Sequence, residues 1–223
     1  RTIVDLSGLG LDQIEETGEE FRIGCMSTLR QIETHQGLNQ YFGGIFRECT
    51  RHIVGVQMRN CATVGGSIYS RFGFSDILTC MMALDTYVEL YHGGIMPLSE
   101  FAKRPVRRDD KDILVRVIIK KDGRKAAYTT QRNSSTDFPL LACCVSRRGS
   151  NWYVAVGARP SKAQVVTITD DGYDSLAQLA REAADSFTYG TNTRGSSRYR
   201  RQLASVYIRR LMERLTGRSV TIG

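Results

Sequence analysis

The sequence predicts an α+β protein in which a helix-rich α/β domain is followed by a smaller domain with an antiparallel sheet covered by helices. Apolar residues recur at helical spacing early in the chain, whereas the second half holds successive strand-like runs and ends in two amphipathic helical patterns. Residues 1–100 contain seven arginines and twelve acidic residues and so have a net charge of −5. Residues 101–223 contain 24 basic and 11 acidic residues and so have a net charge of +13. We predict a first domain over 1–102, a linker over the charged segment 103–111 and a second domain over 112–217.

The first 50 residues predict two strands and three helices. Residues 2–6 read as a strand, and a glycine-containing turn leads through a short helix to a second strand at Phe21–Cys25. Ser27 is a suitable N-cap for the next helix, because its hydroxyl can accept a hydrogen bond from a free N–H group of the first turn. Apolar residues at helical spacing then predict a further amphipathic helix over 38–48.

The rest of the first domain continues this mixture of helix and strand. Ser75 or Asp76 can cap a helix whose apolar residues run to Leu84, and Tyr87–Tyr91 reads as a strand. Pro97–Phe101 then predicts a short helical turn before the linker.

Beyond the linker, four strand-like runs predict a meander of antiparallel strands, and two helices follow. The runs are Ile113–Ile119, Lys125–Thr130, Leu140–Ser146 and Asn151–Gly157. One amphipathic helix is predicted between Leu176 and Phe187, and a longer one between Tyr199 and Leu215. These helices would cover the sheet.

No stretch of the sequence suggests a membrane span. The most apolar stretch is interrupted by Asp76, Asp85 and Glu89, so it falls short of the roughly 18 uninterrupted apolar residues that a spanning helix needs. The first residues also lack the apolar core of a secretion signal. We therefore predict a cytoplasmic protein.

The cysteines and histidines predict no metal site within the chain. The six cysteines form no Cys-x-x-Cys pair, and the three histidines show no metal-ligand spacing. Adjacent Cys143 and Cys144 would point to opposite faces of a strand. Free, mostly buried thiols are therefore predicted.

A glycine pair, Gly65 and Gly66, is the candidate for anion binding. Both glycines permit positive φ and lack the Cβ atoms that would keep backbone N–H groups away from an anion. Thr63, Ser67 and Ser70 add hydroxyl groups, and successive N–H groups that converge on one point would suit a pyrophosphate. Taken alone, a Gly-Gly-Ser segment is more often an ordinary turn than an anion-binding loop, so the surrounding sequence has to decide between the two interpretations.

That context resembles the FAD-binding subunits of the xanthine dehydrogenase and carbon monoxide dehydrogenase family. Residues Gly55–Ile68 are similar to the family pattern G-x-Q-I-R-N-x-A-T-x-G-G-N-I, and Ser75-Asp76 and Met82–Asp85 follow at comparable spacings. Shorter family-like pieces occur in order through nearly the whole chain. The resemblance implies the FAD-binding, or medium, subunit of a molybdenum hydroxylase, which is an oxidoreductase.

By this resemblance, electrons pass from 2Fe-2S clusters on a small subunit through FAD to NAD⁺ or another acceptor. A large molybdopterin subunit would hydroxylate the substrate, for example xanthine. The protein would position the flavin, so no catalytic residue is predicted. The expected contacts are with the FAD phosphates and ribityl region (Thr63, Gly65, Gly66, Ser67, Tyr69, Ser70), its polar chain (Asp76), and its adenine or ring system (Ile113, Leu114).

Departures from the family pattern leave a second hypothesis open. Ser67 stands where the family has asparagine, and Thr129 stands where it has lysine or glutamine. Arg71–Phe74 also stands where the family has small residues or proline. The family's first βαβ unit, of about 30 residues, carries a second phosphate loop and is not among these residues. The alternative is therefore a flavin-free scaffold or regulatory subunit of the same fold.

The arginines near the C-terminus allow two interpretations. They could form an electrostatic footprint for nucleic acid, or a solvated helix face that docks an acidic sister subunit. No recognised nucleic-acid module accompanies them, so a protein partner is predicted and nucleic acid is not.

Overall fold

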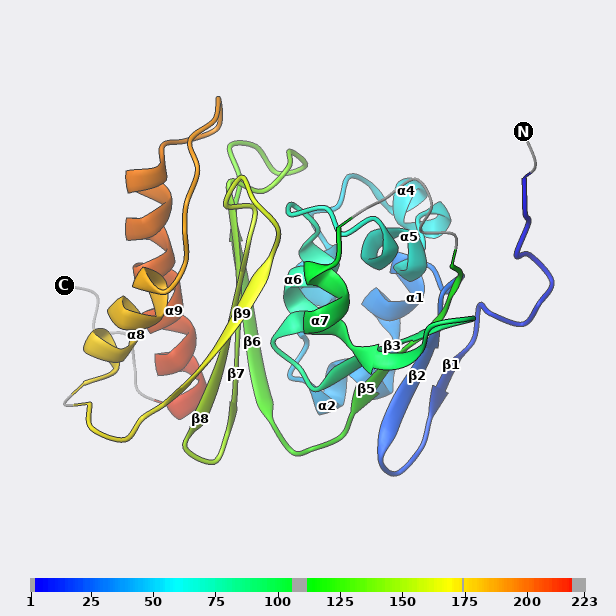
Figure 1. The fold of residues 1–223 in the computed structure, drawn as a ribbon, viewed down its shortest axis with the longest axis horizontal. Helices are drawn as coiled ribbons and strands as arrows, with labels where there is room; N and C mark the ends of the chain where they lie inside the picture. The colour runs from blue at the N-terminus through cyan, green and yellow to red at the C-terminus, as the bar shows by residue number, and fades with distance from the viewer. Residues whose placement is uncertain (1–2, 106–111, 174, 218–223) are drawn as a thin grey trace.

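The structure is a computed structural model, and it describes residues 3–105, 112–173 and 175–217. Within these residues the strands form two antiparallel sheets, shown in Figure 1. The five-stranded sheet has the order β1-β2-β5-β3-β4, and the four-stranded sheet has the order β6-β7-β8-β9. The first sheet comprises β1 Ile14–Glu16, β2 Glu20–Gly24, β3 Thr86–Leu90, β4 Gly94–Pro97 and β5 Leu114–Lys120. The second comprises β6 Lys125–Gln131, β7 Leu141–Arg148, β8 Asn151–Gly157 and β9 Gln164–Thr169.

Helices fill the space between the sheets and cover the outer face of the second one (Figure 1). The inner helices are short: α1 Leu29–Thr34, α2 Gln36–Tyr41, α3 Ile45–Thr50, α4 Val56–Cys61, α5 Val64–Tyr69, α6 Asp76–Met82 and α7 Leu98–Lys103. The outer pair is α8 Leu176–Asp185 and α9 Ser197–Thr216. The predicted α+β class and the two C-terminal helices are therefore confirmed.

The four-stranded sheet is buried on both faces, because α3 and α6 pack on one side and α9 packs on the other. Alternate residues of its strands enter two different cores. Tyr128 and Cys144 join the core around α3 and α6, whereas Cys143 and Trp152 join the core around α8 and α9. The predicted opposite orientation of the two cysteines is confirmed, and all six cysteines are free, with only Cys61 exposed.

The start of the chain differs from the prediction. The first strand is β1, not residues 2–6, and the short helix predicted before Phe21 is absent from the described residues. Ile14 pairs with Ile23 across a tight turn in which the Thr17 N–H donates to the Glu20 carbonyl at 2.9 Å. This hairpin gives Ile14–Glu16 an antiparallel partner, so the segment becomes a strand.

Two helix predictions also change in detail. The helix predicted over 38–48 is two helices, α2 and α3, because Gly43 and Gly44 between them adopt φ values of 66° and 83°. The cap of α1 is Thr28, not Ser27, since the Thr28 hydroxyl accepts a hydrogen bond from the Gln31 N–H at 3.1 Å and Gln31 closes a capping box.

The predicted meander is wrong in its first strand. Residues 114–120 form β5, which lies between β2 and β3 in the first sheet, and β9 supplies a fourth strand of the second sheet that was not predicted. Val117 and Ile119 are fully buried in the first core, which explains this placement. The chain therefore passes from the first sheet to the second between β5 and β6. Most of the predicted linker, residues 106–111, lies outside the described residues. The division into two domains stays a prediction.

Within the described residues, no helix combines the length and the apolarity that crossing a membrane requires.

Candidate cofactor-binding site

The glycine pair lies in the first turn of α5 rather than in an open loop. Thr63 is the N-cap, and its Oγ1 accepts a hydrogen bond from the Gly66 N–H at 3.1 Å. A Cβ atom at Gly65 would lie 2.7 Å from the Cys25 carbonyl oxygen. Gly65 therefore allows two backbones to approach closely, and the positive φ expected of the pair is not found, because both glycines are helical.

The expected convergence of free N–H groups on one point is not found either. The Val64 N–H donates to the Ser27 carbonyl, and the Gly65 N–H donates to the Cys25 carbonyl, both at 2.8 Å. These bonds hold the start of α5 against the end of β2. The backbone donors that would have formed an anion nest are therefore used inside the protein.

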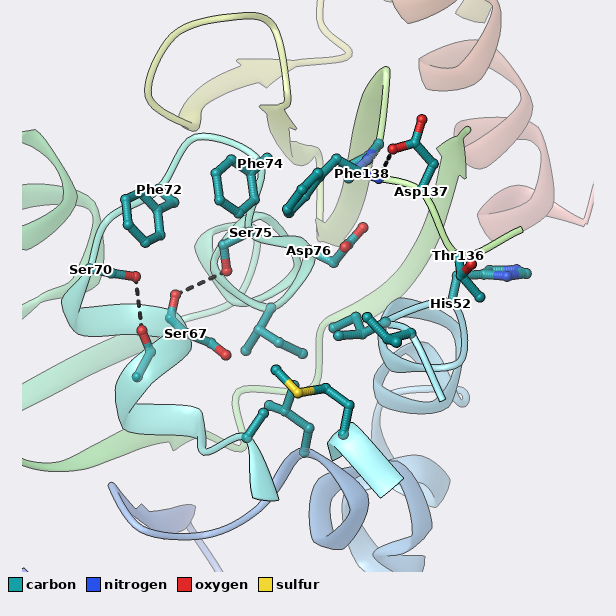
Figure 2. Close-up of a pocket in the computed structure, with 18 of the residues that line it drawn as sticks. His52, Ser67, Ser70, Phe72, Phe74, Ser75, Asp76, Thr136, Asp137 and Phe138 are labelled. Atoms are coloured by element: carbon teal, nitrogen blue, oxygen red, sulfur yellow. Dashed lines mark hydrogen bonds between the residues drawn. The ribbon is translucent and has the colours of Figure 1, made fainter. Parts of the chain in front are cut away.

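A cavity of about 480 Å³ opens beside α5, as Figure 2 shows. Its volume lies within the range of roughly 300–1,000 Å³ that is usual for small-molecule and cofactor sites. Five of the nine residues predicted to bind the cofactor line this cavity: Thr63, Gly66, Ser67, Ser70 and Asp76. The structure thus brings together the hydroxyl-bearing side of α5 and the start of α6.

The other four predicted residues do not line the cavity. Gly65 is buried in the first turn of α5, and the Tyr69 ring packs against Phe101 with their centroids 5.9 Å apart. Leu114 is buried in β5, and Ile113 lies just before it. Both were expected to reach the cofactor from the second domain, but β5 belongs to the first sheet.

Asp76 is the anchored acid of the cavity. Its side chain is only 5% exposed, and its Oδ1 and Oδ2 accept hydrogen bonds from the Tyr128 hydroxyl at 2.5 Å and from the Arg132 guanidinium at 2.7 Å. Burial raises the pKa of Asp76, although the contacts with Arg132 and Tyr128 partly offset this effect. Burial, followed by the charge of Asp76, holds the pKa of Tyr128 well above its usual value. Asp76 thereby joins α6 to the second sheet.

Arg132 and His52 form a polar end of the cavity. Among the described residues, the Arg132 Nε is buried and has no hydrogen-bond partner, so it is a donor that a ligand could use. Burial, together with the charges of Arg51 and Arg132, lowers the pKa of His52. The imidazole is therefore neutral at neutral pH, and the positive charge at this end comes from Arg132.

Sequence reasoning missed the apolar lining. Exposed side chains of Val54, Met58, Phe72, Phe74 and Phe138 line the cavity. The departure at Arg71–Phe74 was a usable signal for two of them, since small residues or proline were expected there. Met58 lies in α4, inside the family-like segment, but was not singled out, and Val54 and Phe138 reach the cavity from separate connections.

Val54 carries backbone strain at the edge of the cavity. Its φ is 49°, a value that a β-branched residue adopts rarely, and its side chain is 55% exposed. Val54→Gly is therefore expected to raise the free energy of unfolding by about 1 kcal/mol, because relief of strain exceeds the added entropy of the unfolded chain. Urea denaturation measures this change.

Val56→Gly is the matched control. Val56 is also exposed but is the first residue of α4 and has no positive φ to relieve, so glycine should lower the free energy of unfolding, by at most about 1 kcal/mol. If both variants lose stability equally, the strain assigned to Val54 is wrong.

The two-sheet fold and the lined cavity define a cofactor-binding α+β module. A family model described as the FAD binding domain in molybdopterin dehydrogenase matches residues 1–120, which end at the last residue of β5. The match covers more than half of the chain, so this protein belongs to that family of FAD-binding domains. The predicted family and the predicted cofactor of that family, FAD, are confirmed.

Curated relatives match along most of the chain. The nicotine 6-hydroxylase medium subunit of Paenarthrobacter nicotinovorans is 27% identical over 233 residues, which cover 93% of this chain and 80% of the relative. An uncharacterized protein, YgfM, of Escherichia coli K12 is 23% identical over 207 residues, which cover 92% of this chain and 76% of the relative. At the level these findings support, the chain is a medium subunit of the molybdenum hydroxylase family.

Solved structures share the fold. Quinoline 2-oxidoreductase from Pseudomonas putida 86 superposes with a TM-score of 0.78 at 19% identity, covering 93% of this chain and 79% of that one. A Cu,Mo-CO dehydrogenase superposes with a TM-score of 0.77 at 20% identity, covering 94% of this chain and 79% of that one. These identities support the fold alone.

The cavity residues fit a flavin nucleotide. The Ser67 and Ser70 hydroxyls donate to the Thr63 and Gly66 carbonyls at 3.0 and 2.8 Å and keep lone pairs that suit ribityl hydroxyls, and the apolar lining suits a ring system. The buried Arg132 Nε offers a hydrogen bond that the protein leaves unused. These features match the chemistry of FAD.

Proposed function

We propose that this chain is an electron-transfer subunit that holds FAD in the cavity beside α5. When bound, FAD accepts single electrons and passes a hydride to an acceptor, chemistry that side chains alone do not supply. The observation that carries the proposal is the convergence of Thr63, Ser67 and Asp76, all from the family motif, on one cavity with an apolar lining.

The chain's own residues would bind and orient the cofactor. Thr63 would contact the phosphates through its hydroxyl group, and Ser67 and Ser70, whose hydroxyls donate to backbone carbonyls, would accept hydrogen bonds from the ribityl chain. Asp76 retains free lone pairs beside its bonds to Tyr128 and Arg132, so it can accept a further hydrogen bond from the polar chain.

The remaining predicted contacts would act around this centre. Gly65 would set the close packing of α5 that shapes the cavity wall, and Tyr69 would support the end of that helix. Ile113 and Leu114 would lie toward the adenine.

The proposed partners are a large molybdopterin subunit and a small subunit with 2Fe-2S clusters, assembled in the cytoplasm. The substrate of the large subunit would be a nitrogen heterocycle. Xanthine is our first candidate, and the names of the relatives that act on nicotine and quinoline support the wider class. NAD⁺ is the proposed acceptor. Assays of the purified complex with each heterocycle, with and without NAD⁺, test these assignments.

Flavin content tests the proposal directly. The full-length protein, purified with its co-purifying subunits, is expected to show flavin absorbance and to retain FAD through gentle desalting. Release of the flavin by denaturation and its quantification give the FAD content per chain. A protein that contains no flavin and takes up no added FAD would refute the proposal.

Ser67→Asn should tighten FAD binding by up to about tenfold, because the amide reaches further and carries two N–H donors, whereas the single hydroxyl proton of Ser67 is already donated to the Thr63 carbonyl. Fluorescence titration with FAD after removal of bound flavin measures this affinity. Ser186→Asn, at the exposed C-cap of α8, is the control and should bind FAD like the parent protein. Binding by Ser67→Asn that is unchanged, like that of the control, would show that position 67 does not face the cofactor as proposed.

The flavin-free scaffold remains a second candidate, because the first N–H groups of α5 are all bonded within the protein. If neither the parent nor Ser67→Asn binds FAD while the partner subunits still co-purify, the scaffold is favoured.

A further inference from the structure

One side of the cavity is formed by exposed aromatic rings. We call Phe72, Phe74 and Phe138 the aromatic wall; they are 54%, 40% and 51% exposed, and Figure 2 shows them in a row above Ser75 and Asp76. The Phe72 and Phe74 rings are nearly parallel, at 11° with centroids 5.1 Å apart. The Phe138 ring meets Phe74 edge to face at 4.6 Å. Exposing three contiguous rings is unfavourable in water, so this surface suits an apolar, planar ligand.

The wall is held in place before any ligand binds. Gly73, between two of its rings, accepts a hydrogen bond from the Ala158 N–H at 2.6 Å and approaches Ser161 so closely that a Cβ atom would lie 2.0 Å from the Ser161 carbonyl oxygen. Phe138 lies under the Arg194 guanidinium, 5.4 Å from the ring centroid. The rings are therefore fixed by contacts from the β8–β9 connection and from the segment before α9.

The position of the wall relative to α5 indicates which ring of a flavin nucleotide it would meet. At the N-terminal end of α5, Gly65 bonds to Cys25, and the Cys25 N–H bonds to the Val115 carbonyl, next to Ile113 and Leu114. The wall lies beyond the C-terminal end of α5. With the phosphates along the hydroxyl-bearing side of α5, a ring system of FAD falls at the wall, and this extended aromatic surface suits the larger ring, the isoalloxazine.

We propose that the isoalloxazine ring of FAD packs against the aromatic wall, and that this contact supplies binding energy that the family obtains from asparagine at position 67. The inference rests on the proposed function. It is carried by two departures at one site: Ser67 replaces a longer amide, and Phe72 and Phe74 replace small residues or proline. The buried, unpaired Arg132 Nε lies at the same cavity and would be available to an oxygen or nitrogen at the edge of the ring.

The first test measures FAD affinity in the full-length protein. Phe74→Ala and Phe138→Ala are each expected to weaken FAD binding by about tenfold, and the double variant by about 100-fold, because each loses an aromatic contact and its buried area. Ile95→Ala is the control, since Ile95 is 63% exposed on β4 and does not line the cavity. Thermal unfolding without FAD should show that all variants fold.

The second test reads ring contact without relying on affinity. A tyrosine ring within contact distance quenches flavin fluorescence by donating an electron to the excited flavin, whereas a phenylalanine ring does not. Phe74→Tyr and Phe138→Tyr should therefore bind FAD and shorten its fluorescence lifetime relative to the parent, and Ile95→Tyr should not.

The outcomes separate the inference from the proposed function. FAD binding by the parent, with unchanged affinity in both alanine variants and unchanged lifetime in both tyrosine variants, would overturn the aromatic contact and leave the proposed function standing. A parent protein that takes up no FAD would overturn both. Weakened binding together with shortened lifetimes would support the wall as the site of the isoalloxazine ring.

Discussion

Asp76→Ala is expected to lower the free energy of unfolding by about 3–5 kcal/mol, because it leaves the buried Arg132 guanidinium without its counter-charge. Both side chains are less than one-tenth exposed, and their ion pair is 2.7 Å long. The Tyr128 hydroxyl, which is buried and donates to the same carboxylate, would also lose its partner. Since α6 and the segment after β6 both line the cavity, FAD retention should be lost as well. Denaturant unfolding and flavin content measure the two effects.

A matched control separates burial from charge. Asp185 pairs with Arg201 at the same distance, 2.7 Å, but these side chains are 54% and 59% exposed. Asp185→Ala should therefore cost at most about 1 kcal/mol and leave FAD binding unchanged. A loss of less than about 1 kcal/mol in Asp76→Ala would contradict the anchoring role of this acid.

The fold could be predicted where a pattern is local. Helical spacing located α6, α8 and α9, and strand-like runs located β5 to β8, because these signals depend on a few neighbouring residues. The sheet to which β5 belongs could not be read in this way. Its place between β2 and β3 depends on pairing with residues about a hundred and about thirty positions away.

Prediction of the site was limited in the same way, because local patterns could be recognised and long-range contacts could not. Thr63, Ser67 and Asp76 were found because they lie in a motif of consecutive residues, and the structure brings them to one cavity. Val54, Arg132 and Phe138 lie on connections that only the tertiary structure brings beside α5, so no local pattern could mark them. Of the glycine pair, Gly66 lines the cavity and Gly65 packs against Cys25, a contact that cannot be seen in the sequence.

A further prediction concerns Arg59, the arginine of the family motif, because it bonds to other groups of this chain rather than to a ligand. Its Nε and Nη2 donate to the two carboxylate oxygens of Glu33 at 2.9 and 3.2 Å, and its Nη1 donates to backbone carbonyls in the segment before α4, including that of Val54. Arg59 and Glu33 are 7% and 8% exposed. Glu33→Ala should therefore lower the free energy of unfolding by about 3–5 kcal/mol, because it leaves a buried, unpaired guanidinium. Glu48→Ala, which removes a partly exposed pair with Arg51, should cost at most about 1 kcal/mol.

The pH dependence of this effect has a definite sign. Burial raises the pKa of Glu33, but hydrogen bonds from Arg59 and Arg30 outweigh it, so the folded-state pKa lies below the ordinary value of 4.5. The stabilisation is therefore fully present above that value and is lost as the pH falls through the folded-state pKa. The difference in unfolding free energy between the parent and Glu33→Gln, which keeps the shape without the titration, should be constant near neutral pH and shrink in acid. A difference that grows in acid would mean that the Glu33 carboxylate is not held by Arg59 in the folded protein.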